Sequence, residues 1–211
     1  MSIYLASRSP RRRELLQQIG VRYEPLLFRE GQRADPDTDE SVRPGEDPDA
    51  YVRRVTVMKA NAAWSRVTMR RGLQRKPVLV ADTTVALTTE VLGKPVDRAD
   101  AERMLALLAG TRHRVLTAVA IIQETRVEIL VNESHVTFAP LTPERIAAYV
   151  QSGESFDKAG AYGIQGYGAT IVSRVDGDYF AVMGLPLQRL TRLLASIGIR
   201  YGFGPLEISD A

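Results

Sequence analysis

The apolar positions of this sequence follow two spacings, one typical of helices and one typical of strands. Helical spacing occurs in five segments, and three apolar residues share one face in the segment over residues 97–109. Two of these segments begin with a cap residue followed by proline, at Ser9 and Thr142. The pattern predicts helices over residues 10–19, 48–69, 97–109, 143–152 and 187–197.

Shorter apolar runs between these helices predict strands. One buried strand, over residues 78–81, is expected to end at Asp82, and Asp176-Gly177 between the last two strands is a hairpin turn signal. Because βα units alternate with antiparallel pairs, the pattern predicts an α/β fold with a mixed sheet. The strands are expected over residues 3–6, 23–28, 78–81, 115–123, 127–138, 170–175 and 179–183.

Two segments stand outside this pattern. Residues 29–49 hold eight carboxylates against three arginines, together with three prolines, and predict a loop long enough to suggest a function. Residues 200–211 fit none of the predicted helices or strands and are expected to form an extra tail. Since the sequence has no repeats and no low-complexity linker, we expect one domain over residues 1–211.

The composition narrows the chemistry that this fold can carry. Of 211 residues, 45% are hydrophobic and 25% charged, which is the balance of a folded protein. The sequence has no cysteine, which excludes disulfides, thiolate metal sites and cysteine nucleophiles. Because there are only two histidines, His113 and His135, any metal is expected to be held by oxygen ligands.

Location and charge limit the partners. The N-terminal residues lack the basic start and the long apolar run of a signal peptide, and no stretch approaches the roughly 20 apolar residues of a membrane span. We therefore expect a cytoplasmic protein with no membrane partner. The net charge of +3 allows two alternatives, a nucleic-acid surface or cations that converge on a small anionic substrate. Nucleic acid is less favoured, because aromatic residues are only 7% and the basic cluster is compact.

That basic cluster, Ser-Arg-Ser-Pro-Arg-Arg-Arg at residues 7–13, lies between a predicted strand and a predicted helix. A helix N-terminus already carries about half a positive charge, so arginines in its first turn are electrostatically misplaced. A bound anion resolves the conflict, since free N–H groups, Ser hydroxyls and guanidinium groups all suit phosphate. The alternative is a solvated basic helix start.

Two further motifs each present one charged residue. Asp82 follows an apolar strand, where ligands of α/β sheets bind, and its carboxylate can hold Mg²⁺ or orient an attacking water. An Asp that caps a turn is the alternative. Gly93-Lys94-Pro95 fixes the backbone around one lysine, a pattern that also suits a solvated turn.

Residues 152–168 combine five glycines with polar side chains that include Glu154, Asp157, Lys158, Tyr162 and Gln165. Glycine permits positive φ and close approach of backbone to a ligand, and the polar side chains can bind a phosphate or a base edge. A purely structural loop is the alternative, although such a density of both kinds rarely serves turns alone. Together the four motifs supply the cations, carboxylates and polar loop that phosphoryl transfer requires.

Five motifs, in order along nearly the whole chain from about Ile3 to Ile199, together resemble the Maf family of nucleotide pyrophosphatases. One such string could occur by chance, but five in order are highly specific. They are Ser-x-Ser-Pro-Arg-Arg-x-Glu-Leu-Leu at residues 7–16, Ala-Asp-Thr-x-Val at 81–85, Gly-Lys-Pro at 93–95, Ser-Gly-Glu…Asp-Lys-Ala-Gly-Ala-Tyr-Gly-Ile-Gln-Gly at 152–166, and Val-x-Gly-Leu-Pro-Leu at 182–187.

The resemblance implies a Maf/ITPase-like α/β fold, with a bent mixed β-sheet, flanking helices and two lobes around a cleft. It implies hydrolysis of the α–β phosphate bond of a nucleoside triphosphate with a divalent cation, Mg²⁺, Mn²⁺ or Co²⁺, commonly by a homodimer. Within the family, the sequence is similar to the dTTP/UTP pyrophosphatase branch. The implied substrates are dTTP and UTP, with modified pyrimidine nucleotides as a further possibility.

Site roles follow from the same resemblance. Asp82 matches the catalytic carboxylate, a general base or metal partner, and Glu40 matches an acidic metal-associated position. The phosphate-facing positions correspond to Ser7, Arg12, Lys59, Lys94 and Lys158. Substrate choice is implied at three positions where the related 7-methyl-GTP branch differs, Arg11, Thr83 and Gln165. Gln165 offers a donor and an acceptor, the pair that a thymine or uracil imide edge requires.

The sequence departs from the family pattern at Arg8, at residues 55–58 before Lys59, at Thr84 and at Phe156. The first two bear on the grip on phosphate, and none removes a catalytic candidate. Two alternatives stay open: a Maf-type pyrophosphatase for another base, including modified or damaged nucleotides, and a nucleotide-binding regulator of cell division or septum formation. The intact catalytic set favours the enzyme, because a pure binder need not keep it.

Overall fold

The computed structural model describes residues 1–26 and 39–208. Much of the predicted loop over residues 29–49, and the end of the strand expected over residues 23–28, lie outside these ranges. The helices are α1 (Pro10–Gln18), α2 (Pro48–Met69), α3 (Arg98–Leu108), α4 (Pro143–Gln151), α5 (Tyr179–Met183) and α6 (Leu187–Ser196), with short 3₁₀ helices η1 (Ala159–Ala161) and η2 (Gly166–Thr170). The strands are β1 (Ile3–Leu5), β2 (Tyr23–Pro25), β3 (Val78–Leu87), β4 (Glu90–Leu92), β5 (Arg112–Gln123), β6 (Arg126–Phe138), β7 (Val172–Asp176), β8 (Ile199–Tyr201) and β9 (Leu206–Ile208).

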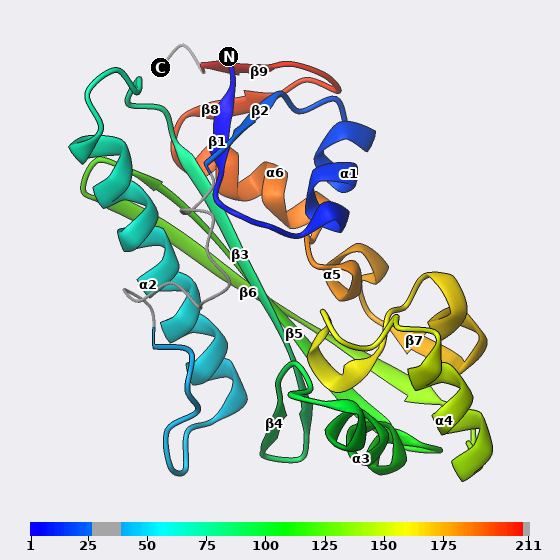
Figure 1. The fold of residues 1–211 in the computed structure, drawn as a ribbon. Helices are drawn as coiled ribbons and strands as arrows, with labels where there is room; N and C mark the ends of the chain where they lie inside the picture. The colour runs from blue at the N-terminus through cyan, green and yellow to red at the C-terminus, as the bar shows by residue number, and fades with distance from the viewer. Residues whose placement is uncertain (27–38, 209–211) are drawn as a thin grey trace.

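Within the described ranges, seven strands form one mixed sheet. Its order is β2-β1-β3-β5-β6-β7, with β4 paired to β3. β1 runs parallel to β2 and β3, whereas β3, β5, β6 and β7 pair antiparallel. In Figure 1 the long strands β3, β5 and β6 run diagonally through both halves of the molecule. The predicted α/β fold with a mixed sheet is therefore confirmed.

The two faces of the sheet are covered differently. Helix α2 covers one face, where Val80 packs with its apolar residues. On the opposite face there are two separate cores, one that joins α1 and α6 to Leu79 and Ala81, and one that joins α3 and α4 to Val85. Figure 1 shows these two helix pairs at opposite ends of the long strands. The two expected lobes correspond to these two cores.

Strand alternation then decides where the candidate residues of β3 point, because successive side chains face opposite sides of a sheet. Even-numbered residues such as Val80 face α2, and odd-numbered residues such as Ala81 face the two cores. Asp82 accordingly meets a side chain of α2, and Thr83 meets a side chain of α1. Neighbouring residues thus serve opposite faces at the boundary between the two cores.

One edge of β3 is open at this point. β1 stays beside β3 only as far as the bond from Ala6 N to Leu79 O, 2.9 Å long, and pairing with β4 begins at Val85. Between them, residues 80–84 pair with no other strand of the described chain on this side, while β5 pairs along their other side. Side chains and loops from both cores can therefore approach Asp82 and Thr83.

Two predicted elements were wrong. β3 does not end at Asp82 but continues to Leu87, because β5 pairs with it throughout. Residues 179–183 form α5 and not a strand, and the Asp176-Gly177 turn leads into that helix. The Asp178 side chain accepts from Ala181 N at 3.1 Å and caps α5. A five-residue apolar run is too short for its period to separate helix from strand.

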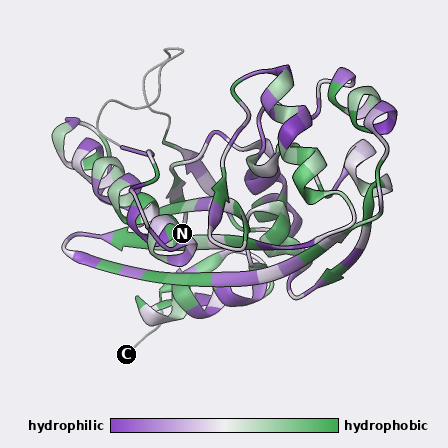
Figure 2. Cartoon of the chain, turned by 90° about the horizontal axis from the view of Figure 1, so that it is seen from below, coloured by the Kyte–Doolittle hydropathy of each residue, from purple (hydrophilic) through white to green (hydrophobic). Residues whose placement is uncertain are grey.

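The carboxyl-terminal segment forms the hairpin β8–β9, which packs on the core of α1 and α6. Leu206 is fully buried there, and the amino group of Met1 donates to its carbonyl oxygen at 2.6 Å. Figure 2 shows that helices and long strands each carry both hydrophobic and hydrophilic residues. No helix in the described ranges has the length and apolar character needed to cross a membrane.

Candidate active site

Asp82 faces Lys59 of α2 at the middle of β3. Lys59 Nζ donates to Asp82 Oδ1 at 2.7 Å and lies 3.0 Å from Glu40 Oε2. The side chains of Asp82 and Lys59 are 17% and 20% exposed, whereas that of Glu40 is 44% exposed. One ammonium group therefore holds two carboxylates together beside the open edge of β3.

Tyr51 of α2 positions the backbone of Glu40. Its hydroxyl donates to the Glu40 carbonyl oxygen at 3.1 Å. Burial, together with the negative charges of Asp82 and Glu40, raises the pKa of Tyr51 to about 12, so the hydroxyl stays protonated at neutral pH. In the sequence, the only signal for this residue is a tyrosine near the start of the helix that follows the acidic loop, and it was not predicted to have a role.

Arg12 reaches from α1 to β3. Its Nη1 donates to Ser7 Oγ and its Nη2 to Thr83 Oγ1, each at 3.1 Å. Its Nε donates to the Gly184 carbonyl oxygen at 2.9 Å. Burial lowers the pKa of Arg12 to about 10 although Asp82 opposes the change, so the group stays charged at neutral pH. The three predicted residues Ser7, Arg12 and Thr83 are thus in direct contact.

Thr83 is held from its other side by Thr117 of β5, a residue to which the sequence analysis gave no role. The two hydroxyl oxygens are 3.0 Å apart, and Thr117 Oγ1 donates to the Ala181 carbonyl oxygen at 2.7 Å. These bonds link Arg12 through the sheet to α5. Thr117 can be recognised only once the strand register places it opposite Thr83.

The start of α1 is placed as predicted, with Ser9 at the N-cap and Pro10 at the first helical position. However, the Ser9 side chain makes no capping bond, and the Ser9 backbone N–H donates to Ser7 Oγ at 3.2 Å. An uncapped helix start retains N–H groups that can bind an anion.

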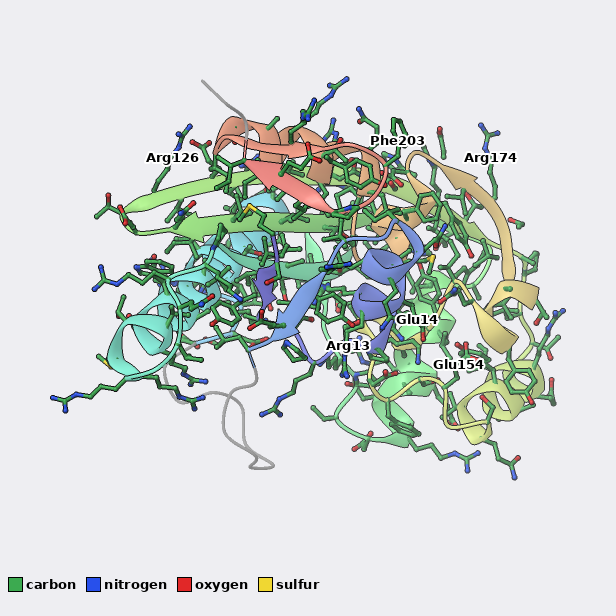
Figure 3. The ribbon with its side chains drawn as sticks, turned by 90° about the horizontal axis from the view of Figure 1, so that it is seen from above. Arg13, Glu14, Arg126, Glu154, Arg174 and Phe203 are labelled. Carbon is green, nitrogen blue, oxygen red and sulfur yellow. The ribbon has the colours of Figure 1, made fainter. Side chains whose placement is uncertain are left out.

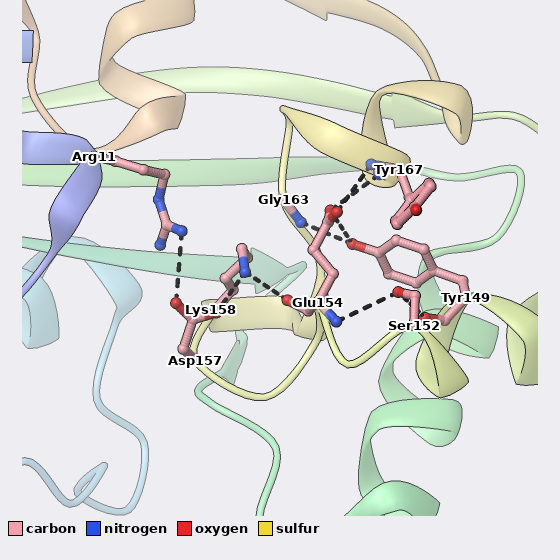
Figure 4. Close-up of polar contacts among 9 residues, drawn as sticks. Arg11, Tyr149, Ser152, Glu154, Asp157, Lys158, Gly163 and Tyr167 are labelled. Carbon is pink, nitrogen blue, oxygen red and sulfur yellow. Dashed lines mark hydrogen bonds and ion pairs between the residues drawn. The ribbon is translucent and has the colours of Figure 1, made fainter. Parts of the chain in front are cut away.

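The Gly-rich loop, residues 152–168, lies across from α1. Lys158 Nζ donates to the Glu154 carbonyl oxygen at 2.5 Å and also contacts the Asp157 carboxylate. The other carboxylate oxygen of Asp157 is 3.7 Å from Arg11 Nη1. Figure 4 shows Asp157 between these two cations. The Arg11–Asp157 ion pair thus connects the two lobes.

Lys94 lies in a turn that contacts the Gly-rich loop, and Gln165 lies in that loop just before η2. The Gly93 carbonyl oxygen accepts from Gly160 N at 3.0 Å, so the Gly93-Lys94-Pro95 turn adjoins η1. Lys94 is exposed and Gln165 is half-buried. Neither side chain has a hydrogen-bond partner in the part of the chain that the structure describes, which leaves both available to a ligand.

The candidate residues therefore form two walls. The strand wall consists of Asp82 and Thr83 with the side chains that hold them, and the loop wall is the Gly-rich loop. Not all basic residues converge here, since Arg126 and Arg174 point outward from opposite ends of the molecule in Figure 3.

A divalent cation fits the strand wall. Over residues 1–26 and 39–208 no three His, Asp or Glu side chains group as a complete metal cage. Asp82 and Glu40, however, already converge on one cationic nitrogen, that of Lys59. Mg²⁺ commonly takes one or two carboxylates and completes its shell with water and substrate phosphates. Two converging carboxylates are therefore a suitable donor set.

Comparisons with known proteins assign the family. The model of the Maf-like protein family matches residues 2–197. The chain is 52% identical over 199 residues to the dTTP/UTP pyrophosphatase of Cupriavidus metallidurans, covering 94% of this chain and 98% of that protein. It is 50% identical over 200 residues to the dTTP/UTP pyrophosphatase of Dechloromonas aromatica, covering 95% and 99%. The protein therefore belongs to the Maf-like family.

Proposed function

We propose that this protein is a nucleoside triphosphate pyrophosphatase that converts dTTP and UTP to the monophosphate and pyrophosphate. The observation that carries the proposal is the pair of carboxylates of Asp82 and Glu40 around Lys59, beside the open edge of β3. The names of relatives that share half of their residues with this chain over nearly its full length support the choice of substrate.

The triphosphate binds between the two walls. Arg12, fixed by Ser7 and Thr83, presents its guanidinium at the uncapped start of α1. Lys158 and Lys94 approach from the other side. Because catalysis of phosphoryl transfer depends mainly on positioning and charge stabilisation, fixed cations on both sides of the phosphates suit the reaction.

Asp82 orients the attacking water and accepts its proton. The water oxygen forms a bond to the α-phosphorus while the bond from this phosphorus to the α–β bridging oxygen breaks, and pyrophosphate leaves. Lys59, now paired with Asp82, contacts the phosphates of the bound substrate. The side chains of Asp82 and Glu40 would hold a divalent cation, Mg²⁺, Mn²⁺ or Co²⁺, which supplies charge neutralisation on the triphosphate.

The base is read by the loop wall. The Gln165 amide provides a donor and an acceptor for the imide edge of thymine or uracil. Arg11 contacts Asp157 of the same loop and Thr83 contacts Arg12, and these two residues are the other proposed determinants of base choice. A preference for another base, including a modified one, is the second candidate, because no hydrogen bond to another described residue fixes the direction in which the Gln165 amide presents its donor and acceptor.

We further propose that residues 1–211 act as one domain, in the cytoplasm where nucleoside triphosphates are available, and as a homodimer. Light scattering coupled to size exclusion tests the dimer. A nucleotide-binding regulator of cell division is the alternative to an enzyme, and it predicts binding without turnover.

The decisive experiment measures pyrophosphate release from a panel of canonical and modified triphosphates with Mg²⁺, Mn²⁺ or Co²⁺. We expect metal-dependent turnover of dTTP and UTP. In Asp82→Asn we expect kcat to fall by about 1,000-fold or more, because the carboxylate that orients water is lost, while nucleotide affinity stays near that of the wild type.

Full activity of Asp82→Asn would refute the catalytic assignment. No turnover of any nucleotide by the wild-type protein, with binding retained, would instead favour the regulatory alternative.

A further inference from the structure

The side chain of Glu154 is the centre of the Gly-rich loop. Its Oε1 accepts from the Tyr149 hydroxyl at 2.8 Å and from Gly168 N at 3.0 Å. Its Oε2 accepts from Tyr167 N at 2.9 Å. The Tyr149 hydroxyl in turn accepts from Gly163 N at 3.1 Å. Figure 4 shows this network, in which the carboxylate binds one end of the turn directly and the other end, at Gly163, through the Tyr149 hydroxyl.

These bonds enclose Gln165. Gly163 lies two residues before it and Tyr167 two residues after it, so its backbone is held on both sides. Tyr167 and Gly168 belong to the first turn of η2, whose N–H groups have no partner within the helix. The Glu154 carboxylate satisfies them from outside, and no side chain of the N-cap residue does so. The same residue holds Lys158, because Lys158 Nζ donates to the Glu154 carbonyl oxygen.

Three of the five glycines of the loop, at positions 163, 166 and 168, are explained by this close packing. A Cβ added at Gly166, where φ is +63°, would lie 2.4 Å from Glu154 Oε2. At Gly163 it would lie 3.1 Å from Glu154 Oε1, and at Gly168 it would lie 1.9 Å from the Gly163 carbonyl oxygen. The chain therefore folds so tightly around the carboxylate that a side chain at these positions has no space.

We propose that Glu154 is a positioning residue that sets base selectivity: it fixes the Gly-rich loop so that Gln165 meets the base while Lys158 meets the phosphates. This inference rests on the proposed function, and it extends that function to a residue that itself contacts no substrate. Because Asp82 lies on the strand wall, loosening the loop wall weakens substrate binding and base discrimination more than it slows the chemical step.

The test is Glu154→Gln, which keeps the shape of the side chain and removes one acceptor oxygen. In either orientation of the amide, a donor of the loop then faces an NH₂ group. We expect KM for dTTP and UTP to rise about tenfold, kcat to change less than about threefold, and the preference in kcat/KM for dTTP over a purine triphosphate to narrow about tenfold.

Tyr149→Phe is a milder variant, since it removes the hydroxyl that links Glu154 to Gly163. It should shift the same quantities in the same direction by a smaller factor, and it serves if Glu154→Gln does not fold. Glu144→Gln, on the exposed side of α4, removes a carboxylate charge from the same lobe and should behave as the wild type.

A merely structural role has a different signature. If Glu154→Gln only unfolded part of the sample, apparent kcat would fall for every nucleotide while KM and base preference stayed constant. Unchanged KM and base preference in Glu154→Gln and Tyr149→Phe would overturn the inference. If the wild-type protein releases no pyrophosphate, the proposed function fails, and calorimetric affinities for dTTP and a purine triphosphate still test Glu154 through the same ratio.

Discussion

The strand wall and the loop wall are held in different ways. In the strand wall, charged side chains satisfy one another, as Lys59 does with Asp82 and Glu40. In the loop wall, backbone N–H groups bond to one carboxylate, that of Glu154. A substrate with phosphates and a cation can replace the partners of the first kind, whereas it leaves those of the second kind in place. We therefore expect the side chains of the strand wall to change partners when substrate binds, and the backbone of the loop wall to keep its conformation.

Among the variants that test this difference between the walls, Gly168→Ala is expected to lose the most activity. The added Cβ would lie 1.9 Å from the Gly163 carbonyl oxygen, so the loop backbone must move. A displacement of about 1 Å at a binding wall can cost about 100-fold, and we expect at least that loss in kcat/KM for dTTP together with a lower Tm. Gly202→Ala is the matched control, because a Cβ there meets no atom within 4 Å. Kinetics of Gly168→Ala equal to those of the control would refute a pre-built loop wall.

Arg12→Lys sharpens the comparison on the strand wall. Lysine keeps the charge but cannot bond Ser7, Thr83 and Gly184 at once, because it lacks the planar fork of arginine. We expect kcat/KM to fall by about 10- to 100-fold, measured by pyrophosphate release. Arg13→Lys, one residue further along α1, should stay within about threefold of wild type. Wild-type activity in Arg12→Lys would mean that only the positive charge matters, and an equal loss in both variants would mean that the bonds of Arg12 have no special role.

The smallest effect concerns the attachment of the loop wall to the sheet. His113 Nε2 is 2.8 Å from the hydroxyl of Tyr162, a residue of the loop. Burial lowers the pKa of His113 to about 4, while histidine in an unfolded chain titrates near about 6.5. Between these values the unfolded chain binds more protons than the folded one. The contribution of neutral His113 to the free energy of unfolding is therefore fully present above about pH 6.5 and is lost as the pH falls towards about 4.

His113→Gln cannot take up this proton. We expect urea unfolding to give a free energy that falls less between pH 7 and pH 4.5 than in the wild type, by on the order of 2 kcal/mol. The same slope in His113→Gln and wild type would contradict a buried neutral His113.

Much of the fold follows from local rules in the sequence. The predicted N-cap at Thr142 is confirmed, since its hydroxyl accepts a hydrogen bond from Arg145 N. The helix of residues 179–183 was predicted as a strand because its five residues form an apolar run with no helical spacing. The N-cap at Asp178, which starts the helix, was not recognised from the sequence. The strand expected to end at Asp82 continues because pairing with β5 outweighs one polar side chain. Such long-range pairing is invisible to a local pattern.

The candidate site divides in the same way. Residues that carry charge and lie in motifs, such as Asp82 and Lys158, could be nominated from the sequence. Residues that act by holding another group could not: Thr117 and Tyr51 gain their partners only through strand register and helix packing. Glu154 was visible in a motif, but its bonds to the loop backbone depend on a fold of the loop that glycine permits and no periodicity encodes.

The alternation of β3 at its open edge has a consequence for how such enzymes can diversify. Asp82 and Thr83 are adjacent in sequence yet make contacts on opposite faces, with α2 and with α1 respectively. If position 83 takes part in base choice as we propose, a change there can alter the preferred base without disturbing the carboxylate of Asp82 next to it. Gene libraries randomised at positions 11, 83 and 165 test this proposal, with new nucleotide preferences and an unchanged Asp82 as the expected outcome.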